Sequence, residues 1–366
     1  MRMASFSFLL ALLFILPSAS AAEPVTLQVI NEKNRDQVMP QGKEVDAIDG
    51  DLVLSNGLVT AVIAQPLATR NANMTVREIG GCLIDLTQLD AQSDQLSCYY
   101  PGSRVYAFRS WSARDAAENP VVINESTQAS HPQALEVVVN AAATEGRAAL
   151  EVVYRLEAGA SNLIIEQTYF NPNPGEVEIN LSDDIRYDSG KEDARRSPNG
   201  KSPLVYVDDV YWQQCYGVAS PGKELTSRSD SRYTIIRYGS GSRQPDLVLK
   251  KGEQFRNTVE LFCAPNLSRL EELYSLASHG SAATSCTFHA LQKDKSVLDG
   301  VPHVRIELTR DGQYAGTLWT DGSGRVDCKL LPGDYEATVS YLNLPLLEKQ
   351  PLKVGNSREE FKLSLP

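Results

Sequence analysis

The 366-residue chain is too long for one ordinary small domain and fits two or three. Hydrophobic residues make up 42% of it, enough for folded cores, and 22% are charged, so wholesale disorder is excluded. The formal net charge of −11 repels phosphate backbones and anionic membranes, which makes nucleic acid and membrane surfaces poor partners.

The first predicted element is a cleavable signal peptide over residues 1–21. Arg2 provides a short positive segment, Phe6–Leu16 form an uncharged apolar run, and Ala19-Ser20-Ala21 supply the small residues that signal peptidase requires. The apolar run is shorter than the ~20 residues that cross a bilayer, which disfavours a transmembrane anchor. We therefore expect a secreted or periplasmic protein with no membrane span after cleavage.

From Val25 onward the sequence has the pattern of β-strands. Two β-rich runs within residues 51–64 flank Asn56-Gly57, a dipeptide that supplies the positive φ angles of a type I′ hairpin turn. Further strands are predicted over residues 121–123, 134–141, 148–156, 162–170, 176–185, 204–207, 210–216, 233–238, 246–249 and 258–263.

One helix is predicted after these strands. Ser268 and Glu271 have the spacing of a capping box, in which each side chain bonds the other residue's backbone amide. Gly280 suits the left-handed position that ends a helix, and His279 suits the negative end of the helix dipole. The apolar stripe along the helix comprises Leu270, Leu273, Tyr274 and Ala277.

Residues 281–366 contain short predicted strands at close spacing, which is typical of a small β-sandwich. Their Thr320-Asp-Gly-Ser-Gly-Arg325 turn precedes a strand, and Leu331-Pro-Gly-Asp-Tyr335 follows it. On these turns, with Asp299–Pro302 and Val304–Leu308, the unit resembles the carboxypeptidase regulatory-like, transthyretin-type domain. The resemblance implies an accessory module that carries no catalytic residues.

Residues 22–280 resemble the β-supersandwich of galactose mutarotase-like, carbohydrate-associated domains. The resemblance rests on Ser55–Ala64, Arg70–Arg77 and Gly80–Leu86. More closely, these residues resemble the N-terminal domain found ahead of secreted metallohydrolases of the polymerase-and-histidinol-phosphatase type. No His-x-His pair occurs and no hydrolase domain follows, so the implied hydrolase activity is not carried over. The expected fold class is mainly β: a large antiparallel β-supersandwich, one short helix, and a small seven-stranded-type β-sandwich.

Planar groups with several hydrogen-bond donors cluster in one predicted loop and suit sugar hydroxyls or a carboxylated sugar. The alternative is a polar loop whose side chains bond its own backbone. These candidate ligand-binding residues are Arg70, Asn71, Asn73 and Arg77.

Two aromatic residues, Tyr211 and Trp212, are further candidates for ligand binding, because sugar rings stack on aromatic faces. Aromatic residues on strands also serve core or cross-strand packing, and that alternative stays open here.

The sequence indicates no catalytic residue, metal site or cofactor. A mutarotase pairs an acid His with a carboxylate. Apart from His279 at the helix end, this body offers only His131, which precedes a proline in a predicted loop. The neighbours Asp183-Asp184 and Asp208-Asp209 face opposite sides of a strand, so neither pair converges.

Six cysteines form an even set without C-x-x-C spacing, which favours disulfides over metal binding in an oxidising compartment. Six cysteines allow 15 connectivities. Proximity in the sequence favours Cys82 with Cys98, Cys215 with Cys263, and Cys286 with Cys328.

These observations favour a secreted or periplasmic, non-catalytic protein that binds carbohydrate or interacts with another exported or envelope protein. Two alternatives are kept. One is a sugar-active enzyme, an epimerase or lyase, on the mutarotase-like body. The other is an accessory part of a metallohydrolase system whose catalytic domain is absent from this chain.

Overall fold

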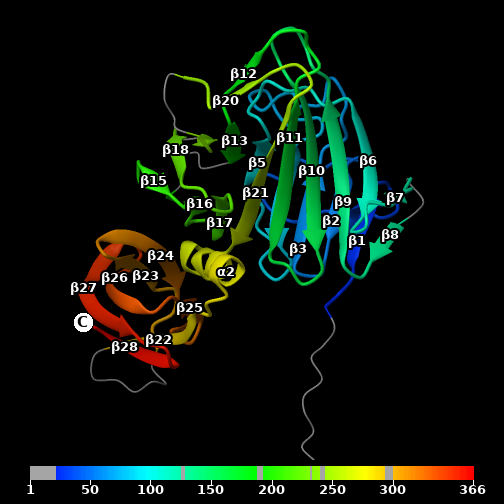
Figure 1. Cartoon of the computed structure of the whole chain (residues 1–366). Helices are drawn as coiled ribbons and strands as arrows, with labels where there is room; N and C mark the ends of the chain where they lie inside the picture. The colour runs from blue at the N-terminus through cyan, green and yellow to red at the C-terminus, as the bar shows by residue number, and fades with distance from the viewer. Residues whose placement is uncertain (1–21, 125–127, 188–192, 231–232, 240–243, 293–299) are drawn as a thin grey trace, which may run out of the picture.

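The computed structural model describes residues 22–124, 128–187, 193–230, 233–239, 244–292 and 300–366 (Figure 1). The predicted signal peptide, residues 1–21, lies outside them. The described chain is mainly β, as predicted, with two helices, α1 (Arg35–Val38) and α2 (Leu267–His279). No helix in these ranges is long and apolar enough to cross a membrane.

A ten-stranded sheet forms one layer of the body, the part of the chain up to α2 (Figure 1). Its paired strands are antiparallel. Their order is β15 (Lys201–Ser202), β18 (Leu225–Ser229), β19 (Tyr233–Arg237), β13 (Ser182–Tyr187), β5 (Leu96–Tyr100), β4 (Leu83–Gln88), β3 (Val59–Ile63), β2 (Leu52–Ser55), β1 (Val25–Val29) and β8 (Gln128–His131).

A nine-stranded antiparallel sheet forms the second layer of the body. Its order is β14 (Ala194–Arg196), β16 (Leu204–Asp209), β17 (Gln214–Ala219), β21 (Gln254–Ala264), β11 (Asn162–Phe170), β10 (Ala149–Glu157), β9 (Ala134–Ala141), β6 (Ser110–Asp115) and β7 (Pro120–Val121). A separate two-stranded sheet pairs β12 (Val177–Ile179) with β20 (Leu247–Leu249).

The two large sheets pack face to face around one apolar core. Successive side chains of a strand point to opposite faces, so Val152 and Tyr154 of β10 enter the core. Fully burying a side chain such as Val152 contributes about 1.5–3 kcal/mol. The same alternation leaves Glu151 and Arg155 on the outer face of the nine-stranded sheet.

A buried carboxylate links the two sheets. Asp183 of β13 is fully buried, and burial raises its pKa although hydrogen bonds to the carboxylate oppose the shift. It accepts hydrogen bonds from the Gly102 amide (2.7 Å) and from Gln167 Nε2 (2.9 and 2.8 Å). The hydroxyls of Tyr238 (2.5 Å) and Tyr99 also donate to it. Because Gln167 lies on β11 of the opposite sheet, the carboxylate joins both layers.

The predicted hairpin at Asn56-Gly57 is present as β2–β3, but the predicted type I′ turn is wrong. Gly57 has a φ of 81°, whereas Asn56 does not have the positive φ that this turn requires. The Asn56 side chain instead accepts bonds from the amides of Leu58 (3.0 Å) and Val59 (2.9 Å). It also donates to the carbonyls of Glu157, the last residue of β10 (2.7 Å), and Ala160, in the turn after β10 (2.8 Å), which anchors the hairpin turn to the other sheet.

Helix α2 begins earlier than the sequence predicts. Its N-cap is Asn266, whose side chain accepts a hydrogen bond from the Arg269 amide (3.0 Å). The capping box predicted for Ser268 and Glu271 is therefore wrong, because Asn266 already satisfies the amide three residues further on. Gly280, with a φ of 63°, ends the helix as predicted.

The described residues of 284–366, which we call the module, form two small sheets with their own core (Figure 1). Its resemblance to carboxypeptidase regulatory-like domains stays a prediction. One sheet has the order β25 (Arg325–Leu330), β22 (Thr284–Gln292) and β28 (Glu359–Leu365). The other has the order β24 (Gln313–Trp319), β23 (Arg305–Arg310), β26 (Gly333–Tyr341) and β27 (Leu344–Val354).

A second buried carboxylate joins the body, α2 and the module. Asp208 of β16 accepts hydrogen bonds from the hydroxyl of Tyr314 on β24 (2.7 Å) and from the Leu267 amide (3.2 Å). Burial raises the pKa of Asp208 to about 7. Ion pairs surround this contact: Arg310 with Glu271 (3.0 Å), Arg195 with Glu307 (2.9 Å) and Arg305 with Asp193 (2.6 Å).

All six cysteines are free thiols in the structure, so none of the three predicted disulfides is present in it. The pairing of Cys215 with Cys263 is wrong, because these residues lie on opposite faces of the nine-stranded sheet. Cys263 packs between the two large sheets, whereas Cys215 packs against α2. The other two predicted pairs do lie side by side: Cys82 with Cys98, and Cys286 with Cys328.

We predict that Asp183→Asn destabilises the protein by about 2–4 kcal/mol, because an amide nitrogen would face hydrogen-bond donors in a dry site. Urea unfolding followed by circular dichroism measures the change. Asp334→Asn, at an exposed position of β26, is the matched control and is expected to stay within about 0.5 kcal/mol of the wild type. Equal stability of the two variants would contradict the role of Asp183.

We also predict a pH dependence from Asp208. Its pKa of about 7 lies above the value of about 3.9 for an unfolded Asp, so the folded protein holds a proton that the unfolded chain releases. The free energy of unfolding should therefore decrease as the pH rises from about 4 to about 7. The charge of Asp209 also raises this pKa, and the charge of Arg195 lowers it.

In Asp208→Asn, the amide oxygen can accept the bonds from Tyr314 and Leu267 without titrating. We expect a shallower decrease in stability over this pH range for the variant, measured by urea unfolding at several pH values. Identical slopes for the two proteins would show that Asp208 does not titrate as described.

Candidate functional site

Arg70, the first predicted ligand-binding residue, lies inside the fold and is 8% exposed. Its Nη2 donates to the carboxylate of Asp51 (2.7 Å) and to the backbone carbonyl of Asp46 (2.6 Å). Burial raises the pKa of the Asp46 carboxyl to about 6. The guanidinium of Arg70 thus holds the segment before β2 against the connection between β3 and β4.

The side chains of Asn71 and Asn73 bond the backbone of their own loop. The amide oxygen of Asn71 accepts from the Glu78 amide (2.9 Å), and that of Asn73 accepts from the Val76 amide (2.9 Å). Arg77 is exposed, and its Nε donates to a backbone carbonyl of the same loop (2.9 Å). These contacts match the alternative of a self-bonded polar loop, and the ligand-binding role of the loop stays a prediction.

Tyr211 and Trp212 lie in the turn between β16 and β17. Tyr211 is 65% exposed, its ring packs edge-on against Trp212 at 5.3 Å between centroids, and Lys43 Nζ lies 5.6 Å from the Trp212 ring centroid. The Trp212 carbonyl accepts from Ser93, which follows β4, whereas Arg70 precedes β4. The segment before β2 passes both groups, because the Asp46 carbonyl accepts from Arg70 and Lys43 lies over the Trp212 ring. The ligand-binding role of Tyr211 and Trp212 stays a prediction.

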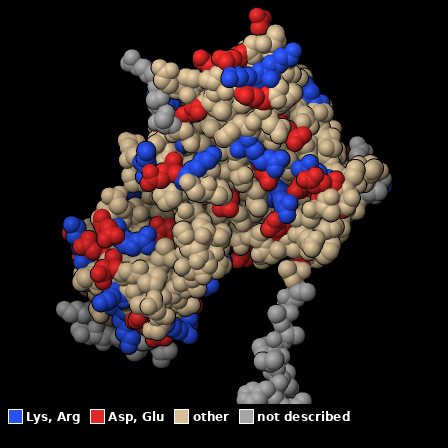
Figure 2. All heavy atoms as spheres, in the orientation of Figure 1, with Lys and Arg blue, Asp and Glu red and all other residues tan. Residues whose placement is uncertain are grey.

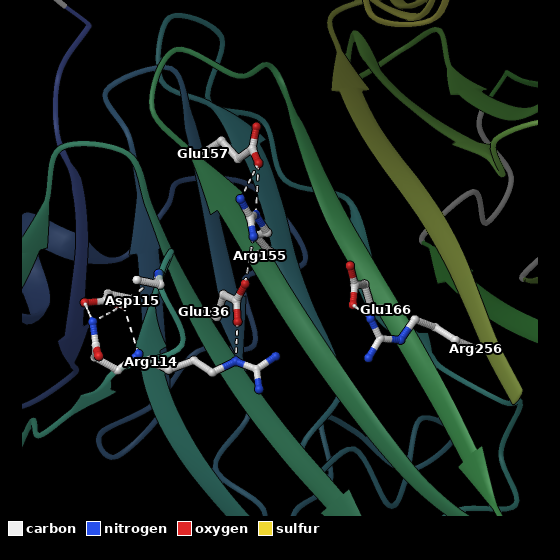
Figure 3. Close-up of polar contacts among 9 residues, drawn as sticks. Arg114, Asp115, Glu136, Arg155, Glu157, Glu166 and Arg256 are labelled. Carbon is white, nitrogen blue, oxygen red and sulfur yellow. Dashed lines mark hydrogen bonds and ion pairs between the residues drawn. The ribbon is translucent and has the colours of Figure 1, made fainter. Parts of the chain in front are cut away.

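A row of alternating charges crosses the outer face of the nine-stranded sheet (Figure 3). Arg114 of β6, Glu136 of β9 and Arg155 of β10 stand directly opposite one another in the register. Glu136 is 4% exposed and accepts from Nε of Arg114 and from Nη1 of Arg155 (3.1 Å). Arg155 also pairs with Glu157 at 2.8 Å. Burial lowers the pKa of Arg155, but its carboxylate partners outweigh this and raise it, so the guanidinium stays charged.

A second ion pair lies on the next two strands of the same face, two residues along from the row in the register. Glu166 of β11 and Arg256 of β21 lie 3.3 Å apart, and Arg256 is 65% exposed (Figure 3). We call the row and this pair the charged face; Figure 2 shows acidic and basic side chains interspersed on this side of the molecule. The register places further hydroxyl and amide groups on the same face: Ser110, Ser112, Asn140, Thr168 and Thr258.

The sequence analysis missed the charged face, although its strands carry a usable signal. In β10, Glu151, Arg155 and Glu157 lie on the same side of the strand, which is the pattern of a face exposed to solvent. Which strands lie beside β10 depends on long-range pairing, so the ion pairs with β6 and β9 could not be read from local pattern.

The described residues contain no group of three or more His, Cys, Asp or Glu side chains that could hold a metal ion. His131 lies on β8, at the edge of the ten-stranded sheet, and its Nδ1 accepts from the amides of Gln133 (3.2 Å) and Ala134 (3.3 Å). It therefore lies beside the first residue of β9, and its charge helps to lower the pKa of Asp115 on β6. The arrangement on the charged face can donate and accept many hydrogen bonds at fixed positions.

No family model matches the chain. No curated protein matches it either. Solved structures match at low identity and with TM-scores below 0.5. A TPR-domain containing protein from Parabacteroides distasonis is 11% identical (TM-score 0.41; 59% of this chain, 47% of that one). A polysaccharide lyase is 10% identical (TM-score 0.34; 75% and 44%). A galactose mutarotase-like protein from Clostridium acetobutylicum is 10% identical (TM-score 0.35; 58% and 94%).

The chain spans less than half the length of the first two of these structures. The structural matches include a galactose mutarotase-like protein, which is the kind of fold that the sequence predicted for the body.

Proposed function

We propose that this is an exported, two-domain, non-catalytic protein that binds carbohydrate on the charged face. The observation that carries the proposal is the Arg114–Glu136–Arg155 row, which presents planar donors and acceptors at fixed spacing on an open sheet. Sugar hydroxyls act as donors and acceptors together, so they fit a surface that offers both. Arginine contributes several N–H donors in a rigid fork, and here only part of that set is used by the glutamates.

Binding fits this face better than catalysis. Cleavage of a glycosidic bond needs one carboxyl group that carries a proton and a second that is ionised. Glu136, Glu157 and Glu166 are each ion-paired with an arginine, so at least one oxygen of each carboxyl group is already engaged by the protein. We therefore prefer a binding role over the alternatives of an epimerase or lyase. A role beside a separate metallohydrolase chain is compatible with glycan binding.

Export to the periplasm or the cell exterior is part of the proposal, and it rests on the predicted signal peptide. The partners we propose are glycans of that compartment. An oxidising environment would convert adjacent thiols to disulfides. Cys286 and Cys328 are direct partners across β22 and β25, and Cys82 and Cys98 are also adjacent.

We predict that Arg155→Gln weakens glycan binding about tenfold, equivalent to ~1.4 kcal/mol, because it removes charge-assisted hydrogen bonds. A glycan array identifies a ligand, and calorimetry measures its Kd for both proteins. Arg237→Gln, at an exposed position of β19 in the other sheet, is the matched control and should bind like the wild type. Absence of binding by the wild type to every glycan tested would overturn the proposal.

We predict that protein isolated from the exported fraction contains the Cys286–Cys328 and Cys82–Cys98 disulfides, while Cys215 and Cys263 stay reduced. Alkylation without reductant, followed by peptide mass spectrometry, distinguishes the two sets. Alkylation of all six thiols in folded exported protein would contradict both the pairing and the oxidising compartment.

A further inference from the structure

A cavity of about 800 Å³ lies where the body, α2 and the module meet. Its walls come from the turn after β4, the first turn of α2, strands β22 and β25, and residues 356–358 before β28. Figure 1 shows α2 beside β25 and β22, at the junction of the two parts. The volume lies within the range of about 300–1,000 Å³ that is usual for small-molecule sites. We call this cavity the junction cleft.

The junction cleft is lined by more positive than negative side chains, although the whole chain carries a net charge of −11. A cavity lined by one sign of charge concentrates ligands of the opposite sign. The basic lining residues are Arg269, Arg325, Lys329 and Arg358, and the acidic ones are Asp90 and Asp327.

The basic side chains keep donors free for a ligand, although three of the four are already paired. Arg325 binds Asp327 through Nε (3.2 Å) and Nη2 (2.7 Å), which leaves its Nη1 free. Arg269 and Lys329 both pair with Glu272, and each has several N–H groups beyond the one used there. Arg358 forms no hydrogen bond or ion pair with the described residues, although it lies close enough to help lower the pKa of Asp327. These donors come from α2, β25 and the turn before β28, so they surround the cavity.

Neutral polar groups complete the lining. Ser285 supplies a hydroxyl, and Gln88 and Asn356 supply amides, which can both donate and accept hydrogen bonds. Among the described residues, no aromatic side chain lines the cavity. This combination suits a ligand that has many hydroxyl groups and an anionic group, rather than a flat apolar molecule.

We propose that the junction cleft binds the anionic residue of an acidic oligosaccharide, a uronate, with Arg325 and Arg358 holding its carboxylate. The proposal rests on the carbohydrate-binding function proposed above and adds a second subsite to it. A carboxylate matches the planar fork of a guanidinium, and the remaining hydroxyls of the sugar match the serine and amide groups. A neutral sugar would bind at the charged face and not in the junction cleft.

The test is calorimetry on the full chain with three ligands of equal length: a uronate oligosaccharide, a sulfated one and a neutral one. The variants are Arg358→Gln alone and Arg325→Gln combined with Arg358→Gln. Neither variant removes a partner of Glu272. Lys353→Gln, at an exposed position of β27, is the matched control. Circular dichroism verifies that each variant is folded.

We expect the double variant to bind the uronate ligand at least about tenfold more weakly, with neutral binding unchanged. We also expect wild-type affinity for the uronate to decrease with added salt, and this decrease to be smaller in the double variant. Binding of the uronate that is equal in the wild type and the double variant overturns the junction cleft as its site.

Other outcomes separate this proposal from the proposed function. If the wild type binds neutral but not acidic ligands, the carbohydrate-binding function stands and the junction cleft proposal fails. If the sulfated ligand binds more tightly than the uronate, the assignment to a carboxylate is wrong. Loss of uronate binding in Arg155→Gln but not in the double variant places the acidic ligand on the charged face. Absence of binding to all three ligands overturns both proposals.

Discussion

The buried carboxylate of Asp183 is the constraint on which the two-layer body depends. A charged group without water must be hydrogen-bonded, and here its donors come from both large sheets. Gln167 of β11 is one of these donors, so the contact fixes how β11 lies over the ten-stranded sheet. Because side chains alternate along a strand, the residues on either side, Glu166 and Thr168, are thereby directed outward. The polar interior and the charged face are consequences of the same register.

A similar constraint governs the junction between the body and the module. Asp208, the last residue but one of β16, accepts hydrogen bonds from the first amide of α2 and from the hydroxyl of Tyr314 in the module. The ion pair between Arg310 and Glu271 extends this contact along the helix. With α2 held against both parts, its first turn and the outer face of β25 become two walls of one cavity. The junction cleft therefore exists only in the assembled chain.

Arginine has two different uses in this protein. Arg70 is buried and satisfies the carboxylate of Asp51, so it stabilises loops of the body. Arg155 lies on an open sheet between two glutamates, where it keeps donors available to a ligand. Arg358 lines the junction cleft without a hydrogen bond or ion pair to the described residues. The three residues are all arginines, and their roles differ because the fold places different hydrogen-bond acceptors beside each guanidinium group.

The sequence by itself determined the features that depend on neighbours along the chain. Strand alternation in β10, the hairpin at Asn56-Gly57 and the helix end at Gly280 follow from local backbone preferences. Tertiary structure decided the rest, because strands distant in sequence supply the partners. Pairing of β9 with β6 and β10 brought Glu136 between two arginines, and pairing of β17 with β21 separated Cys215 from Cys263. Local pattern carries no information about such pairings, so neither the charged face nor the junction cleft could be derived before the fold was known.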